Sequence, residues 1–140
     1  MTSLSTIAMA IVGLAFTILI FRIKRELDMA EKGETTWIAF SDWLVIIALL
    51  VAGLFVLVPL LANDAAGRSR VLISAVSFSI VMMLGWVPAI LAHYRLIFGR
   101  RRSGPRQNPE PAEGIIVIVI VLLSTAAFGL TYFLPRLLTR

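Results

Sequence analysis

Asp42, His93 and Arg95 are residues whose side chains could do acid–base or anion-binding chemistry at the edge of an apolar run. A carboxylate, an imidazole and a guanidinium in such a place would suit a membrane enzyme or a lipid-handling protein. His93 is the sole histidine and the chain has no cysteine, so the ligands of a zinc or bis-histidine haem site are missing. We expect His93 to be solvated or hydrogen-bonded locally. We expect Asp42 to cap the following helix or to be solvated, with proton or cation handling as the alternative.

The sequence also lacks the residues that other kinds of catalytic site need. The long apolar runs contain no ionisable side chain, no Gly-rich phosphate-binding loop appears, and no base lies near a serine in the sequence. We therefore expect a non-enzymatic protein with no cofactor and no metal. A pump or proton-coupled exchanger is disfavoured as well, because it needs a titratable group inside the membrane.

Four long uncharged runs dominate the composition. Of the 140 residues, 59% are hydrophobic and 15% are charged. A soluble domain has about 45–50% apolar and about 25% charged residues. A helix needs about 20 residues to cross the hydrocarbon core of a bilayer, and each run is about that long. The runs are Leu4–Phe21, Trp43–Asn63, Val71–Ala92 and Ile115–Pro135.

These runs predict an all-α integral membrane protein, with residues 1–140 forming a single four-helix transmembrane bundle. The β-branched stretch from Ile115 to Val121 would suggest a strand, but the run stays apolar to Leu134 and an open strand cannot pair its backbone in lipid. The first helix is expected to continue past its span to Gly33, a suitable C-terminal cap. The spans cover about residues 4–22, 42–62, 71–93 and 114–135, and the longer loops are residues 23–41 and 94–113.

The basic residues predict the orientation. With four spans, the first and third connections share one side of the membrane and carry nine Lys and Arg residues, whereas the termini and the second connection carry four. Lys and Arg near span ends favour the cytoplasmic side. Both termini are therefore expected on the extracytoplasmic side of a cytoplasmic (inner) membrane, with loops 23–41 and 94–113 in the cytoplasm.

Arg100, Arg101 and Arg102 form the densest basic cluster. We interpret the cluster as a topological anchor that also attracts anionic lipid headgroups. Nucleic-acid binding is not expected, because the loop lacks interleaved aromatic residues and a recognisable binding fold. An aromatic face precedes the second span and is expected to lie in the interface, with docking of a partner as the alternative. The expected interfacial anchors are Trp37, Phe40, Asp42, Trp43, His93, Arg95, Arg100, Arg101 and Arg102.

Small residues and hydroxyls recur at spacings that suit close packing of membrane helices. We expect them to pack mainly within the chain, with packing between chains as the alternative. Hydroxyls of the third span would instead line a shared axis if the chain formed an oligomeric pore. The packing or pore-lining candidates are Thr6, Ala10, Gly13, Thr17, Ser74, Ser77, Thr125 and Gly129.

The sequence favours a protein that acts by assembly. We expect an accessory or structural subunit, or a scaffold, of a membrane complex, or a self-associating bundle, with the lipid bilayer and other membrane subunits as partners. An oligomeric channel or membrane-perturbing effector is the first alternative. A small membrane enzyme or lipid-handling protein is the second, with its site either among the hydroxyl side chains of the outer half of the bundle or at Asp42, His93 and Arg95.

Overall fold

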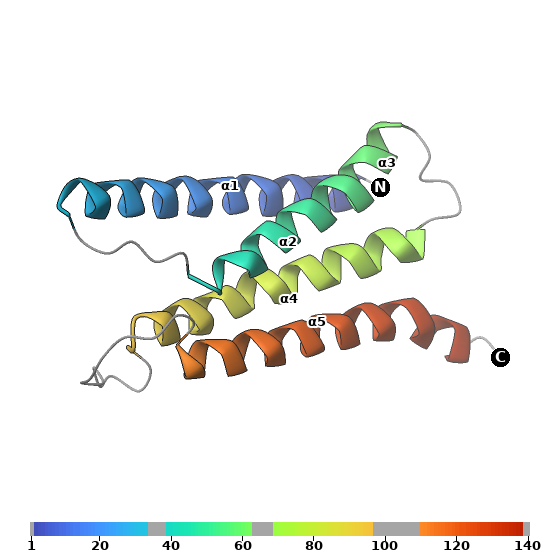
Figure 1. The fold of residues 1–140 in the computed structure, drawn as a ribbon. Coiled ribbons are helices and arrows are strands. Elements are labelled where there is room, and N and C mark those ends of the chain that lie inside the picture. Colours follow the sequence, from blue (N-terminus) through green and yellow to red (C-terminus); the bar gives the residue numbers. More distant parts are fainter. Residues whose placement is uncertain (1, 34–38, 63–68, 97–109, 139–140) are drawn as a thin grey trace.

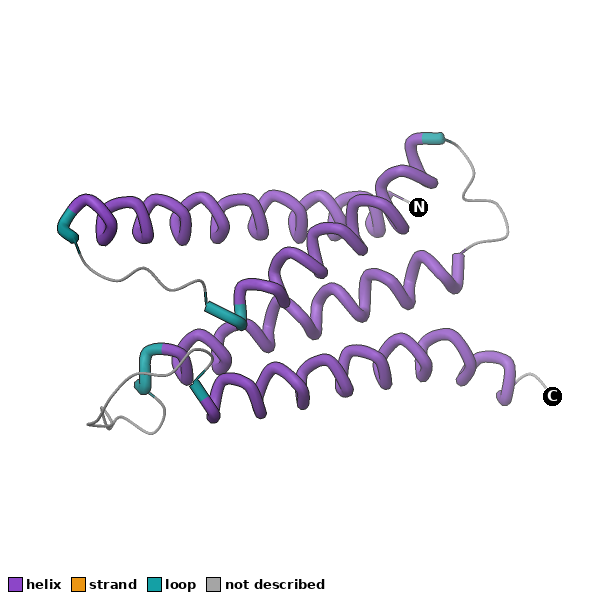
Figure 2. Tube along the Cα trace, in the orientation of Figure 1, coloured by secondary structure: helices purple, strands orange, loops and turns teal. Residues whose placement is uncertain are grey.

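The computed structural model describes residues 2–33, 39–62, 69–96 and 110–138, and every regular element in this part of the chain is helical (Figures 1 and 2). The elements are α1 (Thr2–Glu31), α2 (Asp42–Ala52), η1 (Gly53–Leu57), α3 (Val58–Leu61), α4 (Ser69–His93) and α5 (Pro111–Leu138). α2, η1 and α3 follow one another without a break. They form one helical segment with a single π-helical turn.

Four helical segments are long and apolar enough to cross a membrane: Leu4–Glu31, Asp42–Leu61, Ser69–His93 and Pro111–Leu134. The prediction of an all-helical chain with four such segments is therefore confirmed. α1 ends at Glu31, and Gly33 follows with a φ of 69°, the left-handed conformation that the predicted cap requires.

The helix that contains the predicted fourth span begins one turn before residue 114. α5 begins at Pro111, because the ring of a proline presets φ for the first helical position and its missing N–H has no helical partner there. The acidic side chain of Glu113 then falls in the first turn, where the helix dipole favours negative charge. The third connection is correspondingly shorter than residues 94–113.

The helices alternate in direction, so both chain termini lie at one end of the bundle (Figure 1). We call this the terminal end, and we call the other end, where α1 and α4 finish and α2 and α5 begin, the loop end. α4 is central: it packs against α5, α2 and α1, and α1 also packs against α2. In the most apolar window of each helix, 50% of the residues are buried for α4, against 17% for α1 and 11% for α5.

The packing face of α1 differs from the predicted one. Its buried apolar residues are Ala8, Ile11 and Ala15, whereas the predicted stripe of Thr6, Ala10, Gly13 and Thr17 is exposed. The prediction that this stripe packs within the chain is therefore wrong. Up to Phe21 every side chain of α1 is small or apolar, so the position of α2 and α4, and not the spacing of small residues, decides which face is covered.

α4 and α5 approach most closely at a glycine. A Cβ atom built on Gly85 would lie 2.3 Å from Cγ2 of Ile120 in α5, so the absence of a side chain at residue 85 makes room for Ile120. Nearer the terminal end, the Thr131 hydroxyl of α5 lies 3.0 Å from the buried Ser74 hydroxyl of α4 and donates to it. This contact places Ser74 between two helices of one chain.

Pro59 explains the π-helical turn of the second segment. Its ring cannot donate a hydrogen bond and would collide with the carbonyl of Phe55, four residues earlier, in a regular α-helix. The π turn, Gly53–Leu57, includes that carbonyl, and the N–H of Val58 bonds to the carbonyl of Gly53 five residues earlier. The wider turn lets the helix continue through the proline.

We predict that Gly85→Ala destabilises the protein. The added methyl group would overlap Ile120, whose β-branched side chain moves little, so the free energy of unfolding in mixed micelles should fall by about 1–3 kcal/mol. Ile120→Ala in the same background should recover part of this loss. Gly129→Ala on α5 is the matched control, because its Cβ would meet nothing within 4 Å. Equal effects of the two glycine substitutions would contradict the packing that we describe.

Candidate functional site

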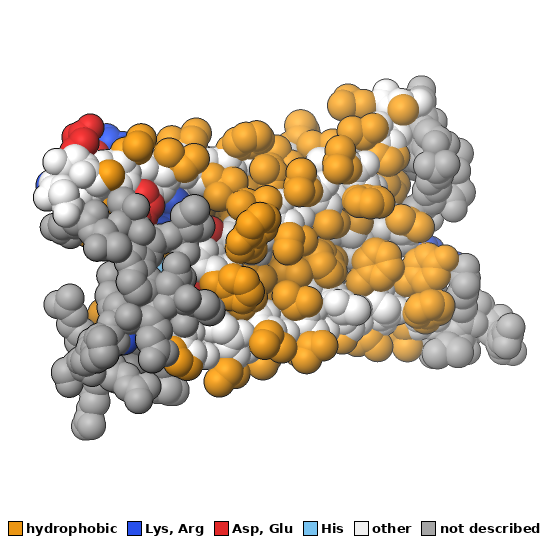
Figure 3. All heavy atoms as spheres, viewed as in Figure 1, with side chains coloured by type: hydrophobic (Ala, Val, Ile, Leu, Met, Phe, Trp, Pro, Cys, Tyr) orange, Lys and Arg blue, Asp and Glu red, His pale blue; other side chains and the backbone are white. Residues whose placement is uncertain are grey.

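Buried and half-buried polar side chains from the four helical segments and the residues next to them meet at the loop end. We call this set the polar layer: Arg22, Ser41, Asp42, Trp86, His93, Tyr94, Arg95, Glu110 and Glu113. In the space-filling view the acidic side chains lie toward the left, at the loop end, and the middle of the visible face is apolar (Figure 3). The polar layer is therefore the part of the described chain in which chemistry could occur.

Asp42, at the start of α2, is the centre of the first half of the layer. Its carboxylate accepts the Nε–H of Arg22 from α1 at 2.9 and 3.2 Å. The same carboxylate accepts the indole N–H of Trp86 from α4 at 3.1 Å. One buried carboxylate, 7% exposed, thus joins three helices.

The guanidinium of Arg22 is held by several groups. It donates through Nη1 to the Tyr94 hydroxyl, and its Nη2 lies 3.5 Å from a carboxylate oxygen of Glu26, one turn along α1. Arg25 also lies over the Tyr94 ring, with its guanidinium carbon 4.5 Å from the ring centroid. Desolvating a guanidinium is costly unless it is paired, and Arg22 is 8% exposed and paired with two carboxylates.

Glu113, in the first turn of α5, is the centre of the second half. Its side chain is 0% exposed; one oxygen accepts the backbone N–H of Ser41 at 2.7 Å, and the other lies 3.0 Å from Nδ1 of His93. Glu113 thus joins α5 to the last residue of α4 and to the residue before α2. His93 also contacts Tyr94 edge to face, with the ring centroids 4.9 Å apart, so the two halves touch.

The third connection is closed at its base by an ion pair. Nη2 of Arg95 lies 2.8 Å from Oε1 of Glu110. Arg95 has a φ of 57°, in the left-handed region, and ends α4 with a Schellman motif: its N–H bonds to Ala92 and the N–H of Leu96 bonds to Leu91. Glycine is usual at this position, and a side chain there costs about 1–2 kcal/mol. Arg95 can pair with Glu110 from this position, whereas a glycine could not.

Two predictions about these residues are wrong. Asp42 does not cap its helix: its carboxylate is bonded to Arg22 and Trp86. His93 is neither solvated nor bonded locally: it is 3% exposed, and its partner lies 20 residues further along the chain. In both cases a buried group of opposite polarity arrives from another helix, which offsets the cost of removing the charge from water.

Sequence reasoning also missed Arg22, Ser41, Trp86, Tyr94, Glu110 and Glu113 as members of a site. Glu110 and Glu113 stand in a segment rich in proline and glycine, a composition that is typical of loops. A signal was available for Glu113, because a proline followed two residues later by an acidic residue is typical of the first turn of a helix. No spacing rule pairs it with His93.

The remaining predicted anchors and packing residues do not gather at one site. Phe40 and Trp43 are exposed, as interfacial anchors would be, whereas Trp37 and Arg100, Arg101 and Arg102 lie outside the described residues. Thr125 is exposed and Gly129 half-buried on α5, and Ser77 is half-buried on α4. Ser74 is bonded to Thr131, so in this chain it faces α5 and not an outer axis.

Two grooves flank α1 at the polar layer, and they differ in charge. The α1–α4 groove, of about 390 Å³, is lined by Ile18, Phe21, Arg22, Arg25, Trp86, Ile90 and Tyr94. The α1–α2 groove, of about 490 Å³, is lined by Leu19, Arg22, Ile23, Glu26, Leu27, Ala30, Asp42 and Ile46. Among these residues the carboxylates line only the α1–α2 groove, so the α1–α4 groove presents guanidinium groups without an acidic wall.

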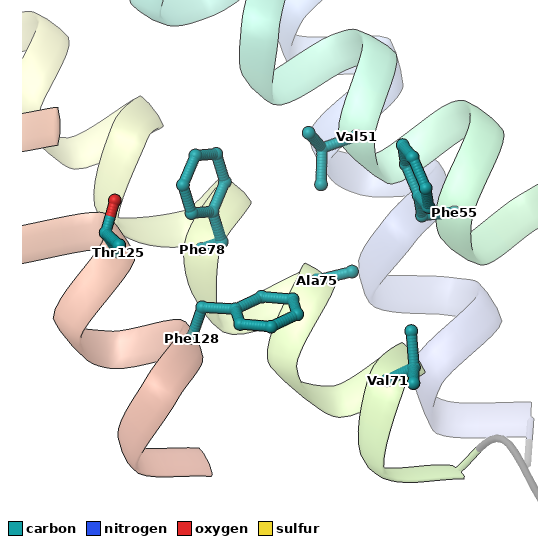
Figure 4. A pocket seen from close by; sticks show the side chains of 7 residues that line it. All are labelled: Val51, Phe55, Val71, Ala75, Phe78, Thr125 and Phe128. Atoms are coloured by element: carbon teal, nitrogen blue, oxygen red, sulfur yellow. The ribbon is translucent and has the colours of Figure 1, made fainter. Parts of the chain in front are cut away.

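A third groove, between α2, α4 and α5, is apolar (Figure 4). It has a volume of about 400 Å³, and Figure 4 shows the rings of Phe55, Phe78 and Phe128 around it. Its one hydroxyl, that of Thr125, donates to the carbonyl of Val121 at 2.9 Å. Nothing in this groove could position a polar substrate.

The polar layer is suited to joining helices. Each carboxylate of Asp42 and Glu113 is bonded to groups of at least two other segments, and no three acidic, histidine or cysteine side chains of the described residues are arranged to hold a metal ion. The Ser41 hydroxyl is buried without a hydrogen-bond partner in this part of the structure. Comparison with protein-family models, curated proteins and solved structures finds no match to this chain.

We predict that Asp42→Asn destabilises the protein by about 3–5 kcal/mol, because it leaves the Arg22 guanidinium buried beside a neutral partner. The measurement is the free energy of unfolding in mixed micelles. Asp28→Asn, on the exposed side of α1, is the matched control and should change it by less than about 0.5 kcal/mol.

The double variant Arg22→Met with Asp42→Leu should recover most of the loss, since it leaves no charge unpaired. Additive losses in the double variant would show that Arg22 and Asp42 do not act as a pair.

Proposed function

We propose that this chain is a multi-pass protein of a cytoplasmic (inner) membrane, with both termini on the extracytoplasmic side. Four helical segments of suitable length and hydropathy support insertion. Both termini lie at one end of the bundle (Figure 1). Segments 22–42 and 93–114, which join the uncharged runs at the loop end, carry nine of the thirteen Lys and Arg residues, as cytoplasmic loops do. The polar layer would then lie near the cytoplasmic surface, where buried charges can be reached by water.

We propose that the protein acts by assembly, as a non-enzymatic accessory or structural subunit of a membrane complex. The observation that carries this proposal is the exposed stripe on α1. In lipid, helices associate through small residues that allow close approach, and a Cβ on Gly13 would meet nothing within 4 Å. This face has no side chain at Gly13 and is exposed in the chain, so a helix of another subunit could pack closely against it.

The polar layer supports the same role. Its acidic side chains are bonded to arginine, histidine, indole and backbone groups of neighbouring segments. They hold α1, α2, α4 and α5 in one arrangement at the loop end. A fixed arrangement is what a structural subunit needs in order to present one helix face to a partner.

The first test is the native mass of the protein extracted gently with its surrounding lipid. We expect a complex with other subunits or with further copies, and we expect Gly13→Ile to lower the assembled fraction several-fold, because a branched side chain blocks close approach of helices. Leu14→Ile, at an exposed neighbouring position, is the matched control and should leave it unchanged.

A hetero-complex would support the subunit role and identify the partner, and a homo-oligomer would support self-association. A homo-oligomer of fixed number that also conducts solute would favour the channel alternative. A monomer in native lipid would contradict the proposal.

The orientation can be tested by labelling, because the chain has no cysteine. We expect single cysteines in Ser3→Cys and Thr139→Cys to react with a membrane-impermeant maleimide added to intact cells. A cysteine in Ser103→Cys should react only after the membrane is permeabilised. The reverse pattern would place the termini in the cytoplasm and contradict the proposed topology.

A further inference from the structure

The α1–α4 groove changes from apolar to polar along its length. On α1, Ile18 and Phe21 precede Arg22 and Arg25, and on α4, Trp86 and Ile90 precede Tyr94. The one polar group of Trp86, its indole N–H, is bonded to Asp42. Both helices run toward the loop end, so the two walls change in the same direction. The groove is thus apolar toward the middle of the bundle and basic at the loop end.

The polar end of this groove offers an anion-binding group. The Arg25 side chain is 43% exposed, and its guanidinium carbon lies over the Tyr94 ring, 4.5 Å from the centroid, where a cation–π contact favours it. Its Nη1 forms an ion pair with Glu26 at 3.1 Å, and Glu26 is among the residues that line the α1–α2 groove. No carboxylate of the described residues lines the α1–α4 groove.

The apolar end is open to the side. Phe21 is 69% exposed, so the groove is not closed off from the surroundings of α1. In a bilayer, what surrounds a helix at this depth is the acyl chain of a lipid, and the phosphate of that lipid lies at the level of the helix end. A molecule with an apolar tail and an anionic head matches both ends of the groove at once.

We infer that the α1–α4 groove binds one anionic phospholipid, with an acyl chain along Ile18 and Ile90 and the phosphate at Arg25. Basic pockets between transmembrane helices on the cytoplasmic side are typical sites for anionic headgroups. The α1–α2 groove, with its carboxylates, would repel the same headgroup, so the charge difference across α1 selects one groove. The inference rests on the proposed membrane insertion and orientation, but not on assembly with other subunits.

The test is native mass spectrometry of the full-length protein released from detergent micelles that contain equal amounts of phosphatidylglycerol and phosphatidylcholine with the same acyl chains. We expect one phosphatidylglycerol to be retained per chain in preference to phosphatidylcholine. Arg25→Gln should lower this retention about tenfold, the size expected for loss of a hydrogen bond to a charged group. Lys24→Gln removes a neighbouring exposed charge that lines neither groove, and it should change retention less than twofold.

Ile18→Trp tests the contact with the acyl chain separately from the contact with the phosphate. The larger side chain should fill the apolar part of the α1–α4 groove and lower retention while leaving Arg25 in place. Equal retention of the two lipids by the wild-type protein, or equal effects of Arg25→Gln and Lys24→Gln, would overturn the inference. Unchanged retention of phosphatidylglycerol by Ile18→Trp would also overturn the inference. So would a variant that loses a second protein chain, and not a lipid, from the mass spectrum. Lipid retention is counted per chain. A monomer in native lipid would therefore contradict the proposed assembly but would not change the lipid-binding result.

Discussion

A charge that leaves water must be paired, and this constraint determines how the helices of this protein meet. Arg22 of α1 is buried, and Asp42 of α2 is the carboxylate that offsets its desolvation, with Trp86 of α4 donating to the same group. The buried apolar residues of α1 are Ala8, Ile11 and Ala15, so the pairing at the loop end adds a directional contact to a small apolar one. This pairing fixes the position of Arg22 against α2 and α4.

Hydropathy predicted the four helical segments because the number of apolar residues in a row is a local property. The left-handed cap at Gly33 is local too, and it was predicted for the same reason. The packing face of α1 is not local. Its exposed stripe through Gly13 and its buried face through Ala15 are both small and apolar, so the amphipathic pattern that identifies a core face in a soluble helix is absent.

The polar layer was only partly visible in the sequence for a related reason. Asp42, His93 and Arg95 were recognised as chemically capable, but their partners Arg22, Glu113 and Glu110 come from other segments. Ser41 and Glu113 are 72 residues apart and are joined by a backbone N–H, which any residue but proline could supply. No spacing in one sequence encodes such a contact, because it depends on how the helices are arranged in space.

The packing face of α1 and the partners within the polar layer could not be predicted for one physical reason. Lipid tails are as apolar as the helix surfaces, so apolar contacts give little preference for one neighbour over another. Hydrogen bonds and ion pairs are directional, and an unmatched one is costly at low dielectric, so a few of them can select one arrangement among many of similar packing energy. In this chain they are concentrated at one end, whereas the Gly85–Ile120 contact and the Ser74–Thr131 hydrogen bond connect α4 to α5 along its length. Only 17% of the most apolar window of α1 is buried, so its outer face and the grooves beside it are available to lipid or to another subunit.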